Sequence, residues 1–260
     1  MTVGLTVPAD SAAPEAWEAE GPPDAPPIVL LHGAILSRTM WRPLVALLRD
    51  RYRCISLDLP GHGTRAGEPF TMDAAVASVS ETIDREAGGS AVLVGLSLGG
   101  YVAMAVAGAS PARVRGLVVA GATLDPRGLW ALAFIAFGLA LRILPERLIR
   151  GVDVLLMRRL YGRPVVDAVL AGGYFARGGG IAVTRLAGGR YRARLRAYGG
   201  PILVINGDRD FVFSRTERRF VAGVPRLTRL ELPGASHLST LDRPAEVAAA
   251  IRAFEASIGA

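Results

Sequence analysis

Short apolar runs recur along the chain, and each is four to seven residues long. Continuous apolar character indicates strands that are covered on both faces, as in a parallel sheet between helices. Most of the runs end at Gly, Pro or Asp, residues that terminate strands. The pattern predicts strands over 28–31, 52–57, 91–96, 117–120, 202–205 and 227–232.

Helical patterns lie between these runs. We predict helices over 40–49, 72–87 and 98–109, and a closing helix over 244–258. Strand–helix alternation is typical of an α/β protein with a mostly parallel central sheet flanked by helices. Residues 3–7 and 16–20 are further candidates for strands, which would form an antiparallel hairpin at the start of the chain.

The alternation breaks between residues 123 and 198, where no strand-like run recurs. Residues 129–144 are apolar nearly all round, 146–159 have an amphipathic pattern, and 172–189 are rich in glycine. We therefore predict an inserted, mainly helical cap with one flexible segment. The chain would divide into a first core segment (1–122), the cap (123–198) and a second core segment (199–260).

The composition fits a globular protein of 260 residues, with 51% hydrophobic and 20% charged residues. The single cysteine, Cys54, lies in an apolar run, where packing is its expected role, and a lone cysteine is typical of a reducing compartment. The N-terminus lacks the pattern of a secretory signal. The longest uncharged apolar run, 128–141, is shorter than the roughly 18–20 residues of a spanning helix. We expect a soluble, cytoplasmic protein without stable membrane insertion.

The positive charge is concentrated in one segment. All 30 basic residues are arginine, the net charge is +7, and residues 123–196 hold 13 Arg against 4 acidic residues. These arginines form either a solvated face or an attractive surface for an anionic substrate, an acidic carrier domain or a membrane. Arg190, Arg192, Arg194 and Arg196 would share one side of an extended segment but would spread around a helix. No nucleic-acid-binding module is recognisable, so we expect no nucleic-acid partner.

The strongest chemical signal is the run Gly95-Leu96-Ser97-Leu98-Gly99-Gly100. It follows a predicted strand and precedes a predicted helix, which is the context of a G-x-S-x-G nucleophile elbow. A sharp turn there would hold the serine in a strained conformation, and the glycines would allow helix and strand to approach closely. The motif predicts Ser97 as a nucleophile.

A serine nucleophile needs a base and an orienting acid. Of the three histidines, His32 and His62 precede the motif, and only His237 fits the chain order Ser…Asp…His. His32 and His62 are expected to be structural. The acid is expected after the strand 202–205, where Asp208 and Asp210 are both candidates that position alone does not separate.

These features together resemble the α/β-hydrolase superfamily, in particular its small capped esterases, lactonases and haloperoxidase-like members. The resemblance runs from about residue 28 to 254 and covers His32-Gly33, the loop 58–63, the elbow, and the segments 207–210 and 234–237. It implies that Asp210, the last residue of a G-x-x-D pattern, is the acid. It also implies that the backbone N–H groups of Ala34 and Leu98 form the oxyanion hole. A proline common in relatives after this acid is replaced here by the run 211–214.

The sequence thus predicts a hydrolase for a carboxylic ester, lactone or thioester, acting through Ser97, His237 and Asp210. No cofactor or metal site is expected, because no dinucleotide fingerprint, P-loop or cluster of metal ligands is recognisable. The alternatives are perhydrolysis or carbon–carbon cleavage on the same scaffold, or a non-catalytic binding protein. The apolar segment 129–144 either packs on the core or roofs a pocket for a small molecule. Candidate pocket residues are Ile35, Trp130, Phe134, Phe137 and Leu238.

Overall fold

The fold is built on a seven-stranded sheet. The computed structural model describes residues 15–258. The strands follow the order β1-β3-β2-β4-β5-β6-β7 across the sheet, and all neighbouring pairs are parallel except β1 with β3. They are β1 (Trp17–Glu20), β2 (Pro27–Leu31), β3 (Arg53–Leu57), β4 (Ala91–Leu96), β5 (Val114–Ala120), β6 (Ile202–Gly207) and β7 (Leu227–Leu232).

The first strand pairs differently from the expected hairpin. Strand β1 runs antiparallel to β3, with Trp17 opposite Leu57, at the edge of the sheet. The expected partner, 3–7, lies outside the described residues. The other six strands coincide with the six apolar runs, although β5 begins three residues earlier than predicted. The mostly parallel sheet and its flanking helices confirm the predicted α/β-hydrolase class of fold.

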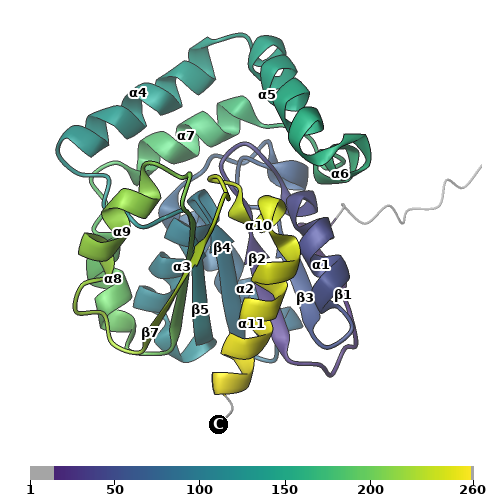
Figure 1. Cartoon of the computed structure of the whole chain (residues 1–260), viewed down its shortest axis with the longest axis vertical. Coiled ribbons are helices and arrows are strands. Elements are labelled where there is room, and N and C mark those ends of the chain that lie inside the picture. Colours follow the sequence, from purple (N-terminus) through teal and green to yellow (C-terminus); the bar gives the residue numbers. More distant parts are fainter. Residues whose placement is uncertain (1–14, 259–260) are drawn as a thin grey trace, which may run out of the picture.

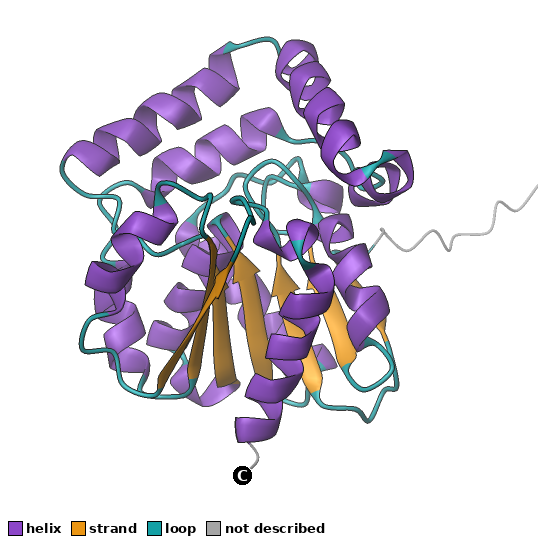
Figure 2. Ribbon diagram, viewed as in Figure 1, coloured by secondary structure: helices purple, strands orange, loops and turns teal. Residues whose placement is uncertain are grey.

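The helices cover both faces of the sheet and one of its ends (Figure 2). They are α1 (Arg42–Leu48), α2 (Met72–Glu86), α3 (Leu98–Ala109), α4 (Leu129–Ile143), α5 (Glu146–Tyr161), α6 (Arg163–Val169), α7 (Ala176–Leu186), α8 (Tyr191–Tyr198), α9 (Phe213–Val221), α10 (Ser239–Asp242) and α11 (Pro244–Ile258). Short 3-10 turns precede α1, follow β3 and precede β5.

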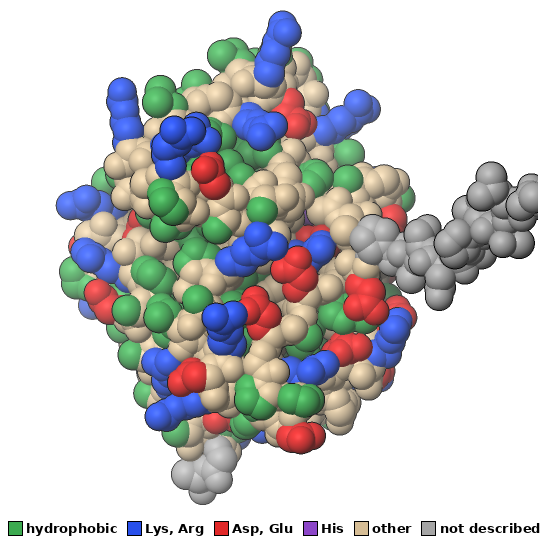
Figure 3. Space-filling view, turned by 90° about the vertical axis from the view of Figure 1, so that its right-hand side faces the viewer, with side chains coloured by type: hydrophobic (Ala, Val, Ile, Leu, Met, Phe, Trp, Pro, Cys, Tyr) green, Lys and Arg blue, Asp and Glu red, His purple; other side chains and the backbone are tan. Residues whose placement is uncertain are grey.

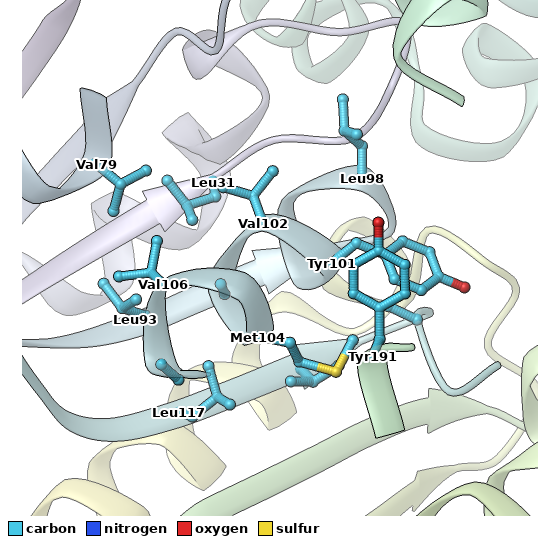
Figure 4. Packing of buried hydrophobic residues seen from close by; sticks show 14 of the residues in the cluster. Leu31, Val79, Leu93, Leu98, Tyr101, Val102, Met104, Val106, Leu117 and Tyr191 are labelled. Carbon is cyan, nitrogen blue, oxygen red and sulfur yellow. The ribbon is translucent and has the colours of Figure 1, made fainter. Parts of the chain in front are cut away.

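Side chains that alternate along the strands pack into two separate hydrophobic cores, one on each face of the sheet. In β2, Val29 and Leu31 point to the core under α2, α3 and α8, while Ile28 and Leu30 point to the core under α1 and α11. Figure 4 shows the first core, where Leu31 lies near side chains of α3. Successive side chains of a strand point to opposite faces of the sheet. Because both faces of this sheet are covered by apolar cores, the strands appear in the sequence as unbroken apolar runs.

Helices α4 to α7 lie over the end of the sheet at which the parallel strands finish (Figure 1). Helix α4 packs along α7, where an added Cβ on Gly180 would lie 2.4 Å from the carbonyl oxygen of Gly138. The glycine-rich stretch therefore forms part of a helix interface, and the expectation of a flexible segment there is wrong. Helix α8 packs against α3 beside the sheet. The segment boundaries at 122 and 198 stay a prediction.

No single helix within residues 15–258 is long and apolar enough to cross a membrane. Helices α4 and α5 meet the criteria of length and composition only as a pair, with a bend of 107° between them.

Candidate active site

The turn between β4 and α3 holds Ser97 in a strained backbone conformation. Its φ of 54° and ψ of −115° are rare for a residue with a side chain. An added Cβ on Gly95 would lie 2.3 Å from the carbonyl oxygen of Gly99, and one on Gly99 would lie 1.9 Å from that of Leu31. Glycine is required at both positions because strand and helix backbones come this close.

Asp210 and His237 meet above the carboxyl ends of the strands. Asp210 Oδ2 lies 2.7 Å from His237 Nδ1. The other carboxylate oxygen of Asp210 accepts the N–H of Phe213 at 3.3 Å, and the Phe213 ring stacks on the imidazole with centroids 5.2 Å apart. The ionised Asp210 therefore favours the tautomer with hydrogen on Nδ1, which leaves Nε2 as the basic atom.

Asp208, the other candidate acid, points elsewhere. It is exposed, and its Oδ1 accepts the backbone N–H of Gly234 at 2.7 Å. This bond ties the loop after β6 to the loop that carries His237. Asp208 thus lies in a position to order the two loops, without contact to the imidazole among the hydrogen bonds of residues 15–258.

Ser97 and His237 line the same two cavities. No hydrogen bond joins their side chains within the described part of the chain. Unliganded active sites commonly hold such pairs at longer separation than the reacting complex does. A molecule bound in either cavity would therefore lie beside both side chains.

The loop after β2 presents a free backbone donor beside Ser97. The N–H groups of Ala34 and Leu98 donate to no acceptor among residues 15–258. Leu98 is the first residue of α3, and the first N–H groups of a helix have no partner within the helix. Both residues line the cavity of Ser97 and His237. Two unsatisfied donors near a nucleophile are what an oxyanion hole requires.

His32 and His62 support this loop from beneath. His62 Nε2 lies 2.6 Å from the carbonyl oxygen of Ala34, and its Nδ1 lies 3.0 Å from that of Pro60. The Nδ1 of His32 donates to the carbonyl of Gly33, and its Nε2 accepts the N–H of Leu59. Burial, reinforced by His62, lowers the pKa of His32 to about 3, and burial also lowers the pKa of His62. Burial thus favours the neutral form of His32, and the contacts of both imidazoles with backbone groups give them a structural role.

Two apolar cavities open from Ser97 on different sides. The first, of about 230 Å³, lies under α4 and α7, and the second, of about 360 Å³, lies under α5. The candidate pocket residues line them: Trp130 and Phe134 the first, Ile35 and Leu238 the second, and Phe137 both.

Several cavity walls were not predicted from the sequence. They come from α5, α7 and the start of α9, and comprise Leu156, Met157, Leu160, Tyr161, Val183, Leu186, Val212 and Phe213. The amphipathic pattern of 146–159 indicated a buried side for α5, but no local pattern tells which cavity that side faces. One side of helix α4 lines the cavities, and another side packs on α7.

A third cavity, of about 320 Å³, adjoins the first across Trp130, which lines both. Arg127, Arg192 and Arg219 line it together with Asp125. The arginines of 190–196 are on helix α8 and its N-cap, so they do not share one side of an extended segment. Arg192 alone of the four reaches this cavity.

Other reactive groups lie outside the site. Cys54 is buried in β3, and burial raises the pKa of its thiol to about 12, which disfavours the nucleophilic thiolate. Within residues 15–258 the fold brings together no group of three or more His, Cys, Asp or Glu side chains that could hold a metal ion.

Comparison with known protein families identifies the fold independently. Residues 28–250 match the family described as "Alpha/beta hydrolase family". The chain belongs to the α/β-hydrolase family. This match confirms the resemblance inferred from the elbow and the order of its flanking motifs.

Two relatives of this α/β-hydrolase that match over nearly the full length of both chains carry names of an ester hydrolase and a lactone hydrolase. A pimeloyl-[acyl-carrier protein] methyl ester esterase of Stenotrophomonas maltophilia is 29% identical, over 90% of this chain and 94% of the relative. The 3-oxoadipate enol-lactonase 1 of Acinetobacter baylyi is 28% identical, over 92% and 91%. Among solved structures, a thermophilic esterase from Thermogutta terrifontis is similar, with a TM-score of 0.77 and 25% identity, over 95% of this chain and 96% of that one.

Proposed function

We propose that this α/β-hydrolase is a serine hydrolase that cleaves a carboxylic ester, lactone or thioester through Ser97, His237 and Asp210. The observation that carries the proposal is the 2.7 Å contact between Asp210 and His237, in a site where His237 and the strained Ser97 line the same cavities. The esterase and lactonase names of the full-length relatives support the same class of reaction.

The reaction proceeds in two acyl-transfer steps. Ser97 Oγ attacks the substrate carbonyl while His237 Nε2 takes its proton, and Asp210 stabilises the resulting imidazolium. The N–H groups of Ala34 and Leu98 donate to the developing oxyanion. The imidazolium returns the proton to the leaving oxygen or sulfur, which departs. Water then attacks the acyl-enzyme with His237 as base, and the acid is released as Ser97 is restored.

The two cavities favour a substrate with apolar parts on both sides of the scissile bond. Aromatic side chains of α4 wall the first cavity, as is usual for pockets that bind apolar groups. We therefore expect medium or bulky acyl groups to be turned over faster than acetyl. A panel of nitrophenyl esters with acyl chains of increasing length measures this, and a clear preference for acetate would contradict it.

The cavity lined by Arg127, Arg192 and Arg219 favours an anionic group at the far end of the acyl part. Guanidinium groups bind carboxylates and phosphates well, and Trp130 lines both this cavity and the acyl cavity. A substrate with a distal carboxylate, or one presented by an acidic carrier domain, matches this charge. No cofactor is part of the proposal.

Hydrolysis by variants of the nucleophile and base tests the proposal. Ser97→Ala and His237→Ala should each lower kcat for nitrophenyl esters by several orders of magnitude, because the triad acts as a unit. Ser80→Ala in α2, a residue that lines neither cavity at Ser97, is the matched control and should leave kcat unchanged. Full activity of Ser97→Ala would show that another group is the nucleophile.

A further inference from the structure

The exposed apolar surface of this protein is concentrated on two adjacent helices. Of the 15 large hydrophobic side chains exposed among residues 15–258, 12 lie within α4, α5 and their connection. They are Leu129, Trp130, Leu132, Phe137, Leu139, Ile143, Leu144, Leu148, Val152, Leu155, Leu156 and Leu160. Single exposed hydrophobic residues are normal, but a gathered set indicates a surface that another apolar phase covers.

The outer side of α4 is entirely apolar. Leu129, Leu132, Leu139 and Ile143, with Ala136 between them, share one side of the helix at spacings of three and four residues. Leu129 is 84% exposed and Ile143 is 77% exposed. The opposite side, with Gly138 and Leu141, packs toward α7. The packing of α4 on α7 therefore does not account for the apolar outer side of α4.

Helix α5 extends the same kind of surface. Leu148, Val152 and Leu155 recur at spacings of four and three residues, and each is 56–60% exposed. Its inner side carries Met157, which is buried. We define the docking surface as these three residues together with the outer side of α4.

Unpaired arginines lie on α4, on α5 and at the start of α6. Arg142, Arg147, Arg150, Arg159 and Arg163 are exposed and form no ion pair within the described residues. Only Arg158 is paired in this part of the chain, with Asp167 at 3.0 Å. Figure 3 shows arginine side chains projecting from the end of the molecule that carries these helices, with hydrophobic side chains between them.

We propose that the docking surface binds the face of an anionic lipid membrane. Its leucine and isoleucine side chains would enter the boundary between headgroups and acyl chains, and its arginines would contact phosphate groups. Helix α4 has 15 residues, about 22 Å at 1.5 Å per residue, which is shorter than a bilayer core of about 30 Å. Together with the 107° bend before α5, this length indicates docking in the plane of the interface.

Charge favours a lipid surface over a second copy of this chain. A symmetric dimer would place the same patch of both copies face to face and would bring like-charged arginines together. Such like-charge contacts are repulsive, whereas an anionic headgroup layer attracts the arginines that face it.

The docking surface also lies beside the cavities. Trp130 and Phe137 of α4 and Leu156 and Leu160 of α5 are partly exposed and line the two cavities at Ser97. An apolar ester dissolved in the membrane would meet these side chains first, so docking would shorten its path from lipid to the site. This consequence rests on the proposed hydrolase function, whereas docking itself does not.

Co-sedimentation with vesicles tests the proposal without substrate. The full chain is mixed with vesicles of phosphatidylcholine alone or of phosphatidylcholine with phosphatidylglycerol. We expect binding to the anionic vesicles to exceed binding to the neutral ones by about tenfold or more at low salt. Absence of binding to the anionic vesicles overturns the proposal.

Two sets of variants separate the apolar and charged contributions. Leu132→Glu with Ile143→Glu and Leu155→Glu changes residues that line neither cavity and should lower vesicle binding about tenfold or more. Leu47→Glu on α1, an exposed leucine outside the docking surface, is the control and should bind as wild type does.

The charged set replaces Arg147 and Arg159 with Gln, against a control that replaces Arg51 and Arg218 outside the cap. Only the first set should reduce the preference for anionic vesicles, by about tenfold. Near-UV circular dichroism and hydrolysis of a short water-soluble ester verify that each variant is folded. Wild-type binding by the triple glutamate variant, or a concentration-dependent dimer that this variant abolishes without any vesicle binding, overturns the proposal.

Discussion

Two aspartates of one loop differ in what their carboxylates contact. Asp210 is buried against His237, whereas Asp208 accepts a backbone N–H from Gly234. Asp210→Asn should lower kcat by about 10⁴-fold, because an amide donor at this position favours the wrong tautomer of the imidazole. Asp208→Asn should cost less than about tenfold, because an amide oxygen accepts the same N–H.

Steady-state kinetics on one nitrophenyl ester compare the two variants. If Asp208→Asn were the crippling change while Asp210→Asn stayed active, the acid of the proposed triad would be misassigned. Thermal melting of both variants excludes unfolding as the cause.

The buried His32 makes stability depend on pH. Its pKa is about 3 in the folded protein and about 6.5 in an unfolded chain, so the unfolded state binds the proton between these values. Its contribution to folding is therefore complete above pH 6.5 and falls as the pH drops toward 3. We expect a loss of about 2–3 kcal/mol between pH 7 and pH 4.5 from this group.

Urea unfolding at several pH values measures this loss. His32→Asn should be less stable at pH 7, since its contacts with Gly33 and Leu59 are altered, but its stability should fall less on acidification. Equal pH dependence in the variant and the wild type would exclude His32 as the source.

At the scale of elements, α7 fits closely against the loop that holds Ala34. An added Cβ on Gly179 would lie 1.8 Å from the carbonyl oxygen of Ala34, and one on Gly178 would lie 2.1 Å from that of Gly61. Both neighbours are backbone atoms, which have little freedom to move. The glycines of α7 thus set how closely this helix approaches the candidate oxyanion hole.

Gly179→Ala should therefore displace the loop and lower kcat/KM by about 100-fold, as misplacement of about 1 Å does in active sites. Gly151→Ala in the exposed part of α5 is the matched control, because an added Cβ there meets nothing within 4 Å. The control should keep its activity and gain about 0.5–1 kcal/mol of stability from its higher helix propensity. Equal activities of the two variants would contradict the role assigned to α7.

These glycines also explain why the helix within 172–189 was not predicted from the sequence. The strands and most core helices were predictable, because burial on both faces leaves unbroken apolar runs such as 91–96. Glycine lowers helix propensity, so 172–189 gave a local signal of flexibility that tertiary packing overrides. The elbow was predictable because its backbone geometry requires particular residues. The walls contributed by α5 and α9 were not, since which cavity a buried side faces depends on packing across the whole chain.

At the scale of the whole molecule, the arginine-lined cavity should make catalysis sensitive to salt. If Arg127, Arg192 and Arg219 attract an anionic ester, kcat/KM for that ester should fall as salt rises from about 0.02 M to about 0.5 M, while a neutral isostere stays level. Replacing the three arginines with Gln should remove the difference. Replacing Arg194 and Arg196, which do not line the cavity, is the control. The same salt response for charged and neutral esters would show that these arginines do not attract the anionic ester.

Covalent labelling identifies the nucleophile of the proposed serine hydrolase. A fluorophosphonate reacts with an activated serine through its hydroxyl oxygen and stays attached, so peptide mass spectrometry identifies the modified residue. We expect one adduct, on Ser97, that is absent from Ser97→Ala and strongly slowed in His237→Ala. A folded wild-type protein that hydrolyses esters but carries no adduct on Ser97, or carries it on another residue, would contradict the proposed role of Ser97.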